Sequence, residues 1–208
     1  MIPDADQKLR ADAARNAELV LRAAREVYAE LGPGAPLEAI AQRAGVGLRT
    51  LYRRFPQKEE LLRAVLVQAI DEQVNPVIER AMGDEDPKRG LVTLMEATLE
   101  MVAREQSVLG AATNAGALTA EVTAPILDAI KALALRAQQA GLIRADLTAD
   151  DMPRIMGMVT SVLWGADPDR EDWRRYLALL LDALDPQAAT PLPQAGPTPP
   201  RSNGHCAT

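Results

Sequence analysis

The chain has 208 residues, of which 48% are hydrophobic and only 3% aromatic, and its formal net charge is −6. This length allows one large domain or two small ones with a hydrophobic core, and the abundance of alanine and leucine favours packed helices over a β-sheet. His205 and Cys206 are the single histidine and the single cysteine, which excludes an intrachain disulfide and a Cys/His metal cluster. We therefore expect an all-α protein with no metal and no cofactor.

The sequence also favours a cytoplasmic location. The first residues, MIPDADQK, are charged where a signal peptide would need an apolar run. No apolar stretch approaches the roughly 20 residues that span a bilayer, so we expect no membrane association.

Hydrophobic spacing of the helical type recurs along the chain and predicts about nine helices. The predicted spans are residues 12–31, 37–44, 48–55, 57 to the proline at 76, 88–104, 124–140, 148–164 and 170–184, with a less regular segment over 106–118. Gly45 and Gly141 suit the residue that ends a helix, and Pro76 should end or kink the fourth helix because proline removes a backbone hydrogen bond. Thr123 with Pro125 is typical of an N-cap followed by an early helical proline.

Both ends of the chain are predicted to be disordered in part or in whole. Residues 1–11 form an N-terminal arm that we expect to be partly disordered. Residues 186–208 contain six prolines and almost no large apolar side chains. Burial of such a segment cannot offset the entropy of ordering it, so we expect a disordered tail.

Residues 37–55 have the pattern of two short helices packed across a tight turn. Ala41 is small enough to let the second helix approach, and Gly45 supplies the backbone bend. Val46, Leu51 and Phe55 would bury the inner face. This is the arrangement of a helix-turn-helix.

The outer face of the same segment is basic. Residues 39–58 contain no acidic residue and five basic ones, which are Arg43, Arg49, Arg53, Arg54 and Lys58. Arginines on one helix face can form bidentate hydrogen bonds to guanine in the major groove. The hydroxyls of Thr50 and Tyr52 are of the type that anchors phosphates, and the amides that begin the next helix, beside Lys58, form an anion site.

Charge is divided unequally along the chain, which reconciles a basic helix with an acidic protein. Residues 1–60 hold ten basic and nine acidic side chains, whereas residues 61–208 hold thirteen and twenty. Because the screening length at physiological salt is about 8 Å, a phosphate on the basic helix would respond mainly to the arginines nearby.

The segment LEAIAQRAGVGLRTLYRRFPQKEELLRAVL resembles the TetR family of transcriptional regulators. The signature T-L-Y-x-x-F-x-x-K-E-x-L is present as Thr50, Leu51, Tyr52, Phe55, Lys58, Glu59 and Leu61. The segment AGLIRADLTADDMPRIM, residues 140–156, is similar to a subgroup of actinobacterial-type regulators. The resemblance implies a homodimeric repressor with two DNA-reading heads, each joined by the fourth helix to a helical body that binds a small-molecule effector.

On this basis the chain divides into a helix-turn-helix DNA-binding domain over residues 12–57 and a regulatory domain for ligand binding and dimerisation over residues 58–185. The expected contacts with double-stranded DNA combine the basic face with the positions that match the family, and are Leu37, Arg43, Gly47, Leu48, Arg49, Thr50, Tyr52, Arg53 and Lys58. Leu48 and Arg49 stand where family members often have small residues, so the resemblance does not imply an operator sequence.

The body offers candidates for a largely apolar effector pocket and for the dimer interface. Methionines suit an adaptable pocket, and polar groups among apolar neighbours suit ligand contacts. The candidates for the pocket are Met95, Thr98, Asn114, Met156, Thr160 and Trp164. The candidates for a four-helix dimer interface are Val159, Leu163, Trp173, Tyr176, Leu177 and Leu180.

Two other functions compete with DNA binding as interpretations of this sequence. Catalysis is disfavoured because the single histidine lies in the tail and GPGAP lacks the lysine and the strand of a phosphate loop. A helical adaptor that binds another protein through the Trp173 helix, without sequence-specific DNA binding, remains the alternative.

Overall fold

The computed structural model describes residues 5–164, 172–187 and 190–193, and every regular element in these ranges is an α-helix. The all-α prediction is confirmed. The helices are α1 (Ala5–Leu31), α2 (Leu37–Ala44), α3 (Leu48–Arg54), α4 (Lys58–Gln73), α5 (Asn75–Met82), α6 (Pro87–Arg104), α7 (Gln106–Asn114), α8 (Ala120–Gln139), α9 (Asp151–Leu163) and α10 (Asp172–Ala183). No described helix combines the length and the hydropathy needed to cross a membrane.

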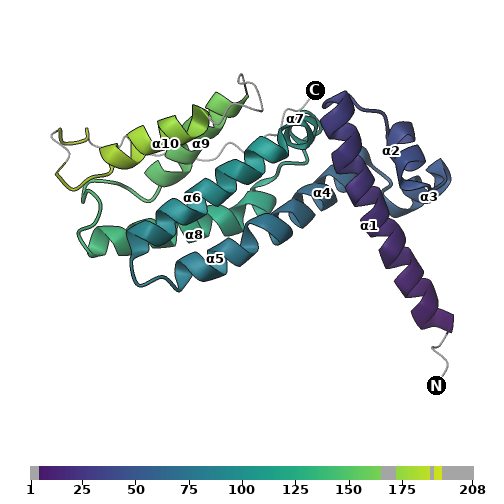
Figure 1. The fold of residues 1–208 in the computed structure, drawn as a ribbon, viewed down its shortest axis with the longest axis horizontal. Helices are drawn as coiled ribbons and strands as arrows, with labels where there is room; N and C mark the ends of the chain where they lie inside the picture. Colours follow the sequence, from purple (N-terminus) through teal and green to yellow (C-terminus); the bar gives the residue numbers. More distant parts are fainter. Residues whose placement is uncertain (1–4, 165–171, 188–189, 194–208) are drawn as a thin grey trace, which may run out of the picture.

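The helices form two parts, which we call the head (α1–α3) and the body (α4–α10). Figure 1 shows α2 and α3 beside the long α1 at one end of the molecule, while α4 leads from there into the body. In the body α6 packs against α5, α8 and α9, and α10 packs on α9. The head meets the body where α1 contacts α4 and α7.

The turn between α2 and α3 has the geometry that its glycine predicts. Gly45 has a left-handed φ of 69°, and the N–H groups of Gly45 and Val46 donate to the carbonyls of Gln42 and Ala41 at 3.1 and 3.0 Å. These bonds satisfy the last carbonyls of α2. Leu51, 0% exposed, then packs into a cluster of buried apolar residues that continues from the head into the body.

Several helix boundaries differ from the prediction. The first helix begins at Ala5 rather than near residue 12, so most of the expected arm is helical, while residues 1–4 lie outside the described residues. The fourth helix ends at Gln73, and Pro76 lies in the first turn of α5, where its missing N–H costs no hydrogen bond. The last helix is described from Asp172, so residues 170 and 171 of its predicted span are outside the described part.

The segment over 106–118 is more regular than predicted. Residues Gln106–Asn114 form α7. A Cβ on Gly110 would lie 3.6 Å from the ring of Pro33 and 3.6 Å from the indole of Trp164. These are ordinary van der Waals distances, so α7 packs on both neighbours at this position.

Two helices in the body begin at other residues than predicted. Thr119, not Thr123, is the N-cap of α8, so Pro125 lies inside the helix. The helix α9 begins at Asp151 rather than at residue 148, because the backbone N–H and the hydroxyl of Thr148 both donate to the Asp151 carboxylate, at 2.7 and 2.9 Å, and hold the preceding turn.

Part of the tail that was predicted to be disordered has defined contacts. Arg144 donates from Nη2 to the carbonyl of Thr190 at 2.8 Å, and the N–H of Leu192 donates to Asp146 at 2.9 Å. These bonds attach the tail to the loop after α8. Residues 188–189 and 194–208, which include His205 and Cys206, lie outside the described residues.

The contact between α5 and α6 depends on a glycine, and Gly90→Ala is expected to destabilise the protein by about 1 to 2 kcal/mol. A Cβ on Gly90 would lie 2.6 Å from the carbonyl oxygen of Ala81 and 3.2 Å from Leu133. Overpacking of this kind lowers the free energy of unfolding by about 1 to 3 kcal/mol. The higher helix propensity of alanine offsets up to about 1 kcal/mol of this loss. Urea denaturation measures the difference.

Gly157→Ala in α9 is the matched control. A Cβ there meets no described atom within 4 Å, so this variant should gain about 0.5 to 1 kcal/mol in the free energy of unfolding. Equal stabilities of the two variants would contradict a close approach at Gly90.

Candidate functional site

The helix α3 buries one face in the head and exposes the other. Leu51 is 0% exposed, whereas the neighbouring Tyr52 is 44% exposed. Arg49 and Arg53, one helical turn apart, are both exposed. The structure thus brings the arginines and the tyrosine of the predicted interface to the surface on a single helix.

The remaining predicted DNA contacts lie around this helix with different exposure. Gly47 is exposed and is the N-cap of α3, while Thr50 is half-buried. Leu37 and Leu48 pack partly against the core. Lys58 begins α4 and is half-buried, and its ammonium lies 5.6 Å from the ring centroid of Tyr28 on α1.

Arg43 has a different environment from the arginines of α3. Its guanidinium donates to Glu30 at 2.9 and 2.5 Å and to Glu26 at 3.3 Å. These hydrogen bonds raise the pKa of Arg43, and they lower the pKa of Glu30 below its usual value. The three side chains connect α2 to α1, and this placement favours an intramolecular role for Arg43 over a DNA contact.

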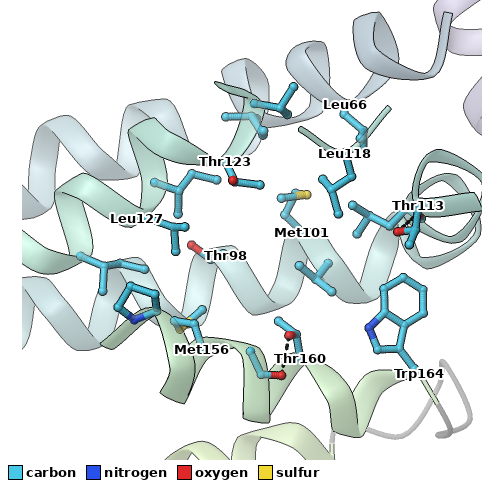
Figure 2. A pocket seen from close by; sticks show the side chains of 18 residues that line it. Leu66, Thr98, Met101, Thr113, Leu118, Thr123, Leu127, Met156, Thr160 and Trp164 are labelled. Carbon is cyan, nitrogen blue, oxygen red and sulfur yellow. Dashed lines mark hydrogen bonds between the residues drawn. The ribbon is translucent and has the colours of Figure 1, made fainter. Parts of the chain in front are cut away.

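A cavity of about 450 Å³ lies in the body, between α4 and α6–α9. Figure 2 shows Thr98 and Met101 of α6 in the middle of its lining, with Leu127 toward one end and Thr113 and Trp164 toward the other. The lining is almost wholly apolar apart from threonine hydroxyls and the indole N–H of Trp164.

Four of the six predicted ligand residues line this cavity, namely Thr98, Met156, Thr160 and Trp164. The structure places the other two elsewhere. Met95 is 0% exposed within the core of the body, and Asn114 lines a neighbouring cleft. Met95 lies on the same side of α6 as Thr98 and Val102, but it is nearly one turn closer to the start of the helix, and the lining of the cavity on α6 begins at Thr98.

The contribution of α4 to the cavity was not predicted from the sequence. Leu66 and Ile70, four residues apart on that helix, are part of the lining. On α8, Val122, Ile126 and Ile130 repeat the same spacing and also line the cavity. The spacing was visible in the sequence, but it does not separate residues that face a cavity from residues that face a filled core.

A second cleft adjoins the cavity at the junction of head and body. Thr113 and Trp164 line both spaces, and the cleft is also lined by Pro33 from the loop between α1 and α2. The indole of Trp164 therefore forms a wall of the cavity and also lies within reach of the head.

The comparisons with known proteins agree with this arrangement of head, linking helix and body. Residues 20–65 match the family model of the bacterial regulatory proteins of the tetR family. Residues 86–186 match the model of the C-terminal domain of SbtR-like transcriptional regulators. The chain belongs to the TetR family of transcriptional regulators.

The individual relatives are also transcriptional regulators. The HTH-type transcriptional repressor LfrR from Mycolicibacterium smegmatis is 40% identical over 96 residues, and the aligned part spans 46% of this chain and 46% of that protein. The TetR regulator SCO0520 from Streptomyces coelicolor is 29% identical, with a TM-score of 0.58 over 83% of this chain and 99% of its own. A TetR regulatory protein from Mycobacterium vanbaalenii has the same identity and TM-score over 85% of this chain and 99% of its own.

In this TetR-family chain a polar junction connects the head to the body beside the cavity. Glu105, 5% exposed, lies between α6 and α7 and accepts hydrogen bonds from Arg25 of α1 and, at 3.2 Å, from Gln73 at the end of α4. Arg25 also donates to Glu72 at 2.9 Å. Although burial alone lowers the pKa of Arg25, the bonds to Glu105 and Glu72 raise it overall.

Most of the residues predicted for a dimer interface are buried within the single chain. Four of the six, which are Val159, Leu163, Trp173 and Leu177, are at most 6% exposed within the single chain. They are unavailable to a partner because α9 and α10 use these faces to pack on each other and on α6 and α8. Of the other two, Leu180 is half-buried and Tyr176 is 44% exposed. The outward faces of α9 and α10 instead carry Met158 and Leu179, which are 55% and 57% exposed.

Proposed function

We propose that the protein is a cytoplasmic, homodimeric transcriptional repressor that binds operator DNA through α3 and leaves it when a small molecule fills the cavity. The observation that carries the proposal is the division of α3 into an apolar face buried in the head and an exposed face with Arg49, Tyr52 and Arg53. A helix of this kind fits the major groove. We assign no catalytic activity to it.

In this proposal the residues of the head have separate tasks. Arg49 and Arg53 reach the edges of bases, where guanine accepts bidentate hydrogen bonds. Thr50, Tyr52 and Lys58 hold phosphates on either side and so fix the register of the helix. Residues 12–57 form the DNA-binding domain, and residues 58–185 form the regulatory domain.

The helix α4 is suited to couple the two domains. It begins with Lys58 beside the head, and Leu66 and Ile70 further along it line the cavity. A ligand in contact with these leucine and isoleucine side chains would shift α4 and change the separation of the two heads, which must lie about 34 to 36 Å apart to read adjacent major-groove segments. Complete switching requires about 5.5 kcal/mol of differential ligand affinity.

Operator binding tests the proposal through Arg49→Ala and Tyr52→Ala. Each variant is expected to lose about 1 to 3 kcal/mol of affinity for the DNA upstream of the protein's own gene if its side chain contacts a base, and loss of a phosphate contact should lower the salt slope by about one. Fluorescence anisotropy over a series of salt concentrations measures both quantities.

Arg80→Ala is the control, because Arg80 is an exposed arginine on α5, outside the head and the proposed dimer interface, and its loss changes the net charge as Arg49→Ala does. It should bind the operator as the unaltered protein does. If Arg49→Ala and Tyr52→Ala also retain full affinity, the helical adaptor is the better description.

A further inference from the structure

The cavity has no ionisable side chain among the described residues that line it. Its polar groups are the hydroxyls of Thr98, Thr113, Thr123 and Thr160 and the indole of Trp164. A charged ligand in such a site would exchange its hydration for apolar contacts without gaining a counter-ion, which is strongly unfavourable. The lining therefore selects uncharged molecules.

Three of the four threonine hydroxyls are already committed as donors, whereas that of Thr123 has only long contacts with the carbonyls of Thr119 and Ala120, at 3.5 and 3.4 Å. Thr98 donates to the carbonyl of Leu94 at 2.8 Å, Thr113 to that of Leu109 at 2.8 Å, and Thr160 to that of Gly157 at 3.0 Å. Figure 2 draws the last two of these bonds. A hydroxyl has one hydrogen and two lone pairs, so each oxygen that keeps its helical bond can only accept a hydrogen bond from a ligand.

Thr98 is the best placed of these acceptors. It is 7% exposed, and Figure 2 shows it near the middle of the lining, between Leu127 and Met101. A donor group on the ligand would meet this oxygen away from bulk water, where a missing partner costs the most free energy.

The volume indicates the size of the part of a ligand that the lining can enclose. An engineered apolar cavity of about 150 Å³ holds one benzene ring, and the cavity here measures about 450 Å³. It therefore accommodates two or three fused rings, or an aliphatic molecule of similar bulk.

We propose that the effector is an uncharged, mainly apolar molecule of two- to three-ring size that donates one hydrogen bond, from a hydroxyl or an N–H group, to Oγ1 of Thr98. Carboxylates, phosphates and ammonium compounds of the same size are excluded. This inference rests on the proposed role of the cavity as the effector site.

Calorimetric titration of the full chain without DNA tests the ligand class. The probes are 2-naphthol, its methyl ether, 2-naphthoate and 2-(aminomethyl)naphthalene. The naphthol is expected to bind about tenfold more tightly than the ether, which has the same rings but no donor. The carboxylate and the ammonium compound are expected to bind at least about 100-fold more weakly than the naphthol.

A pair of variants on α6 locates the hydrogen bond. Thr98→Val keeps the shape of the side chain and removes the oxygen, so it should abolish the preference for the naphthol over its ether. Thr93→Val is the matched control, because Thr93 is exposed and its hydroxyl bonds the Arg89 carbonyl at 2.9 Å in the same way. It should leave the preference unchanged.

Three results would overturn the inference. These are charged probes that bind as tightly as the naphthol, a failure of both neutral probes to bind, and an undiminished preference in Thr98→Val. Operator binding is measured separately by anisotropy. Naphthol binding without any effect on the operator would refute the proposed effector coupling and leave the ligand class intact, whereas absence of operator binding would refute the proposed function alone.

Discussion

Leu179→Glu is expected to separate the proposed dimer and to lower operator affinity by about 100- to 10,000-fold, the gain that comes from linking two binding modules. Leu179 is 57% exposed on α10, and Met158 on the adjacent α9 is 55% exposed. Large apolar side chains on the outward faces of packed helices are suited to a helix-on-helix interface with a second copy. A buried, unpaired carboxylate at such a contact is strongly unfavourable.

The control for this prediction is a leucine of matched exposure on another helix. Leu135 of α8 is 54% exposed, and Leu135→Glu introduces the same charge on a helix outside the proposed interface. Sedimentation should give a dimer for the unaltered protein and for Leu135→Glu, and a monomer for Leu179→Glu. If Leu179→Glu is still a dimer, the interface must lie on another surface. If the unaltered protein is a monomer, the homodimer is refuted.

Glu105→Ala is expected to lower the free energy of unfolding by about 3 kcal/mol. Loss of one partner of a buried ion pair costs about 3 to 5 kcal/mol because the other charge loses its compensation. The lower end applies here, since Arg25 is 28% exposed at the side chain and keeps its bond to Glu72. Urea denaturation measures the loss, and Glu121→Ala, an exposed glutamate of α8, should change stability by less than about 0.5 kcal/mol.

The same variant has a functional consequence in the proposed mechanism. Glu105 joins α1, the end of α4 and the junction of α6 and α7, so its removal should weaken the coupling between cavity and head. Operator release by a bound effector should then require more ligand, although ligand binding itself is unchanged. A destabilisation below about 1 kcal/mol together with normal release would show that the junction is not required for stability or for coupling.

The head was predictable from the sequence because its determinants are local. Gly45, Leu51 and Phe55 lie within a few residues of the turn between α2 and α3. A small residue, a glycine that permits the turn and apolar residues at helical spacing follow one another, and this order predicts two short helices packed across the turn. The role of Arg43 was not predictable in the same way. Its partners Glu26 and Glu30 lie on α1, and only the folded head brings them to the arginine.

The body was predictable as a set of helices but less well as a site. Met95 and Met156 look equivalent in the sequence, yet one fills the core and the other lines the cavity. The choice depends on where α6 and α9 leave a space, which is a property of tertiary packing. The same reason explains the residues predicted for the dimer interface: apolar positions of α9 and α10 such as Trp173 are buried within the chain, whereas Leu179 is exposed and available to the proposed second copy.

The close approach at Gly110 gives the protein a simple route to altered sensitivity. A methyl group there would just touch Pro33 of the head and the indole of Trp164, each at 3.6 Å, whereas a branched side chain would push them apart. In the proposed mechanism, added bulk at residue 110 would therefore press on the head at Pro33 and on the cavity wall at Trp164 at the same time. Substitutions at this one codon would alter ligand affinity and operator affinity together.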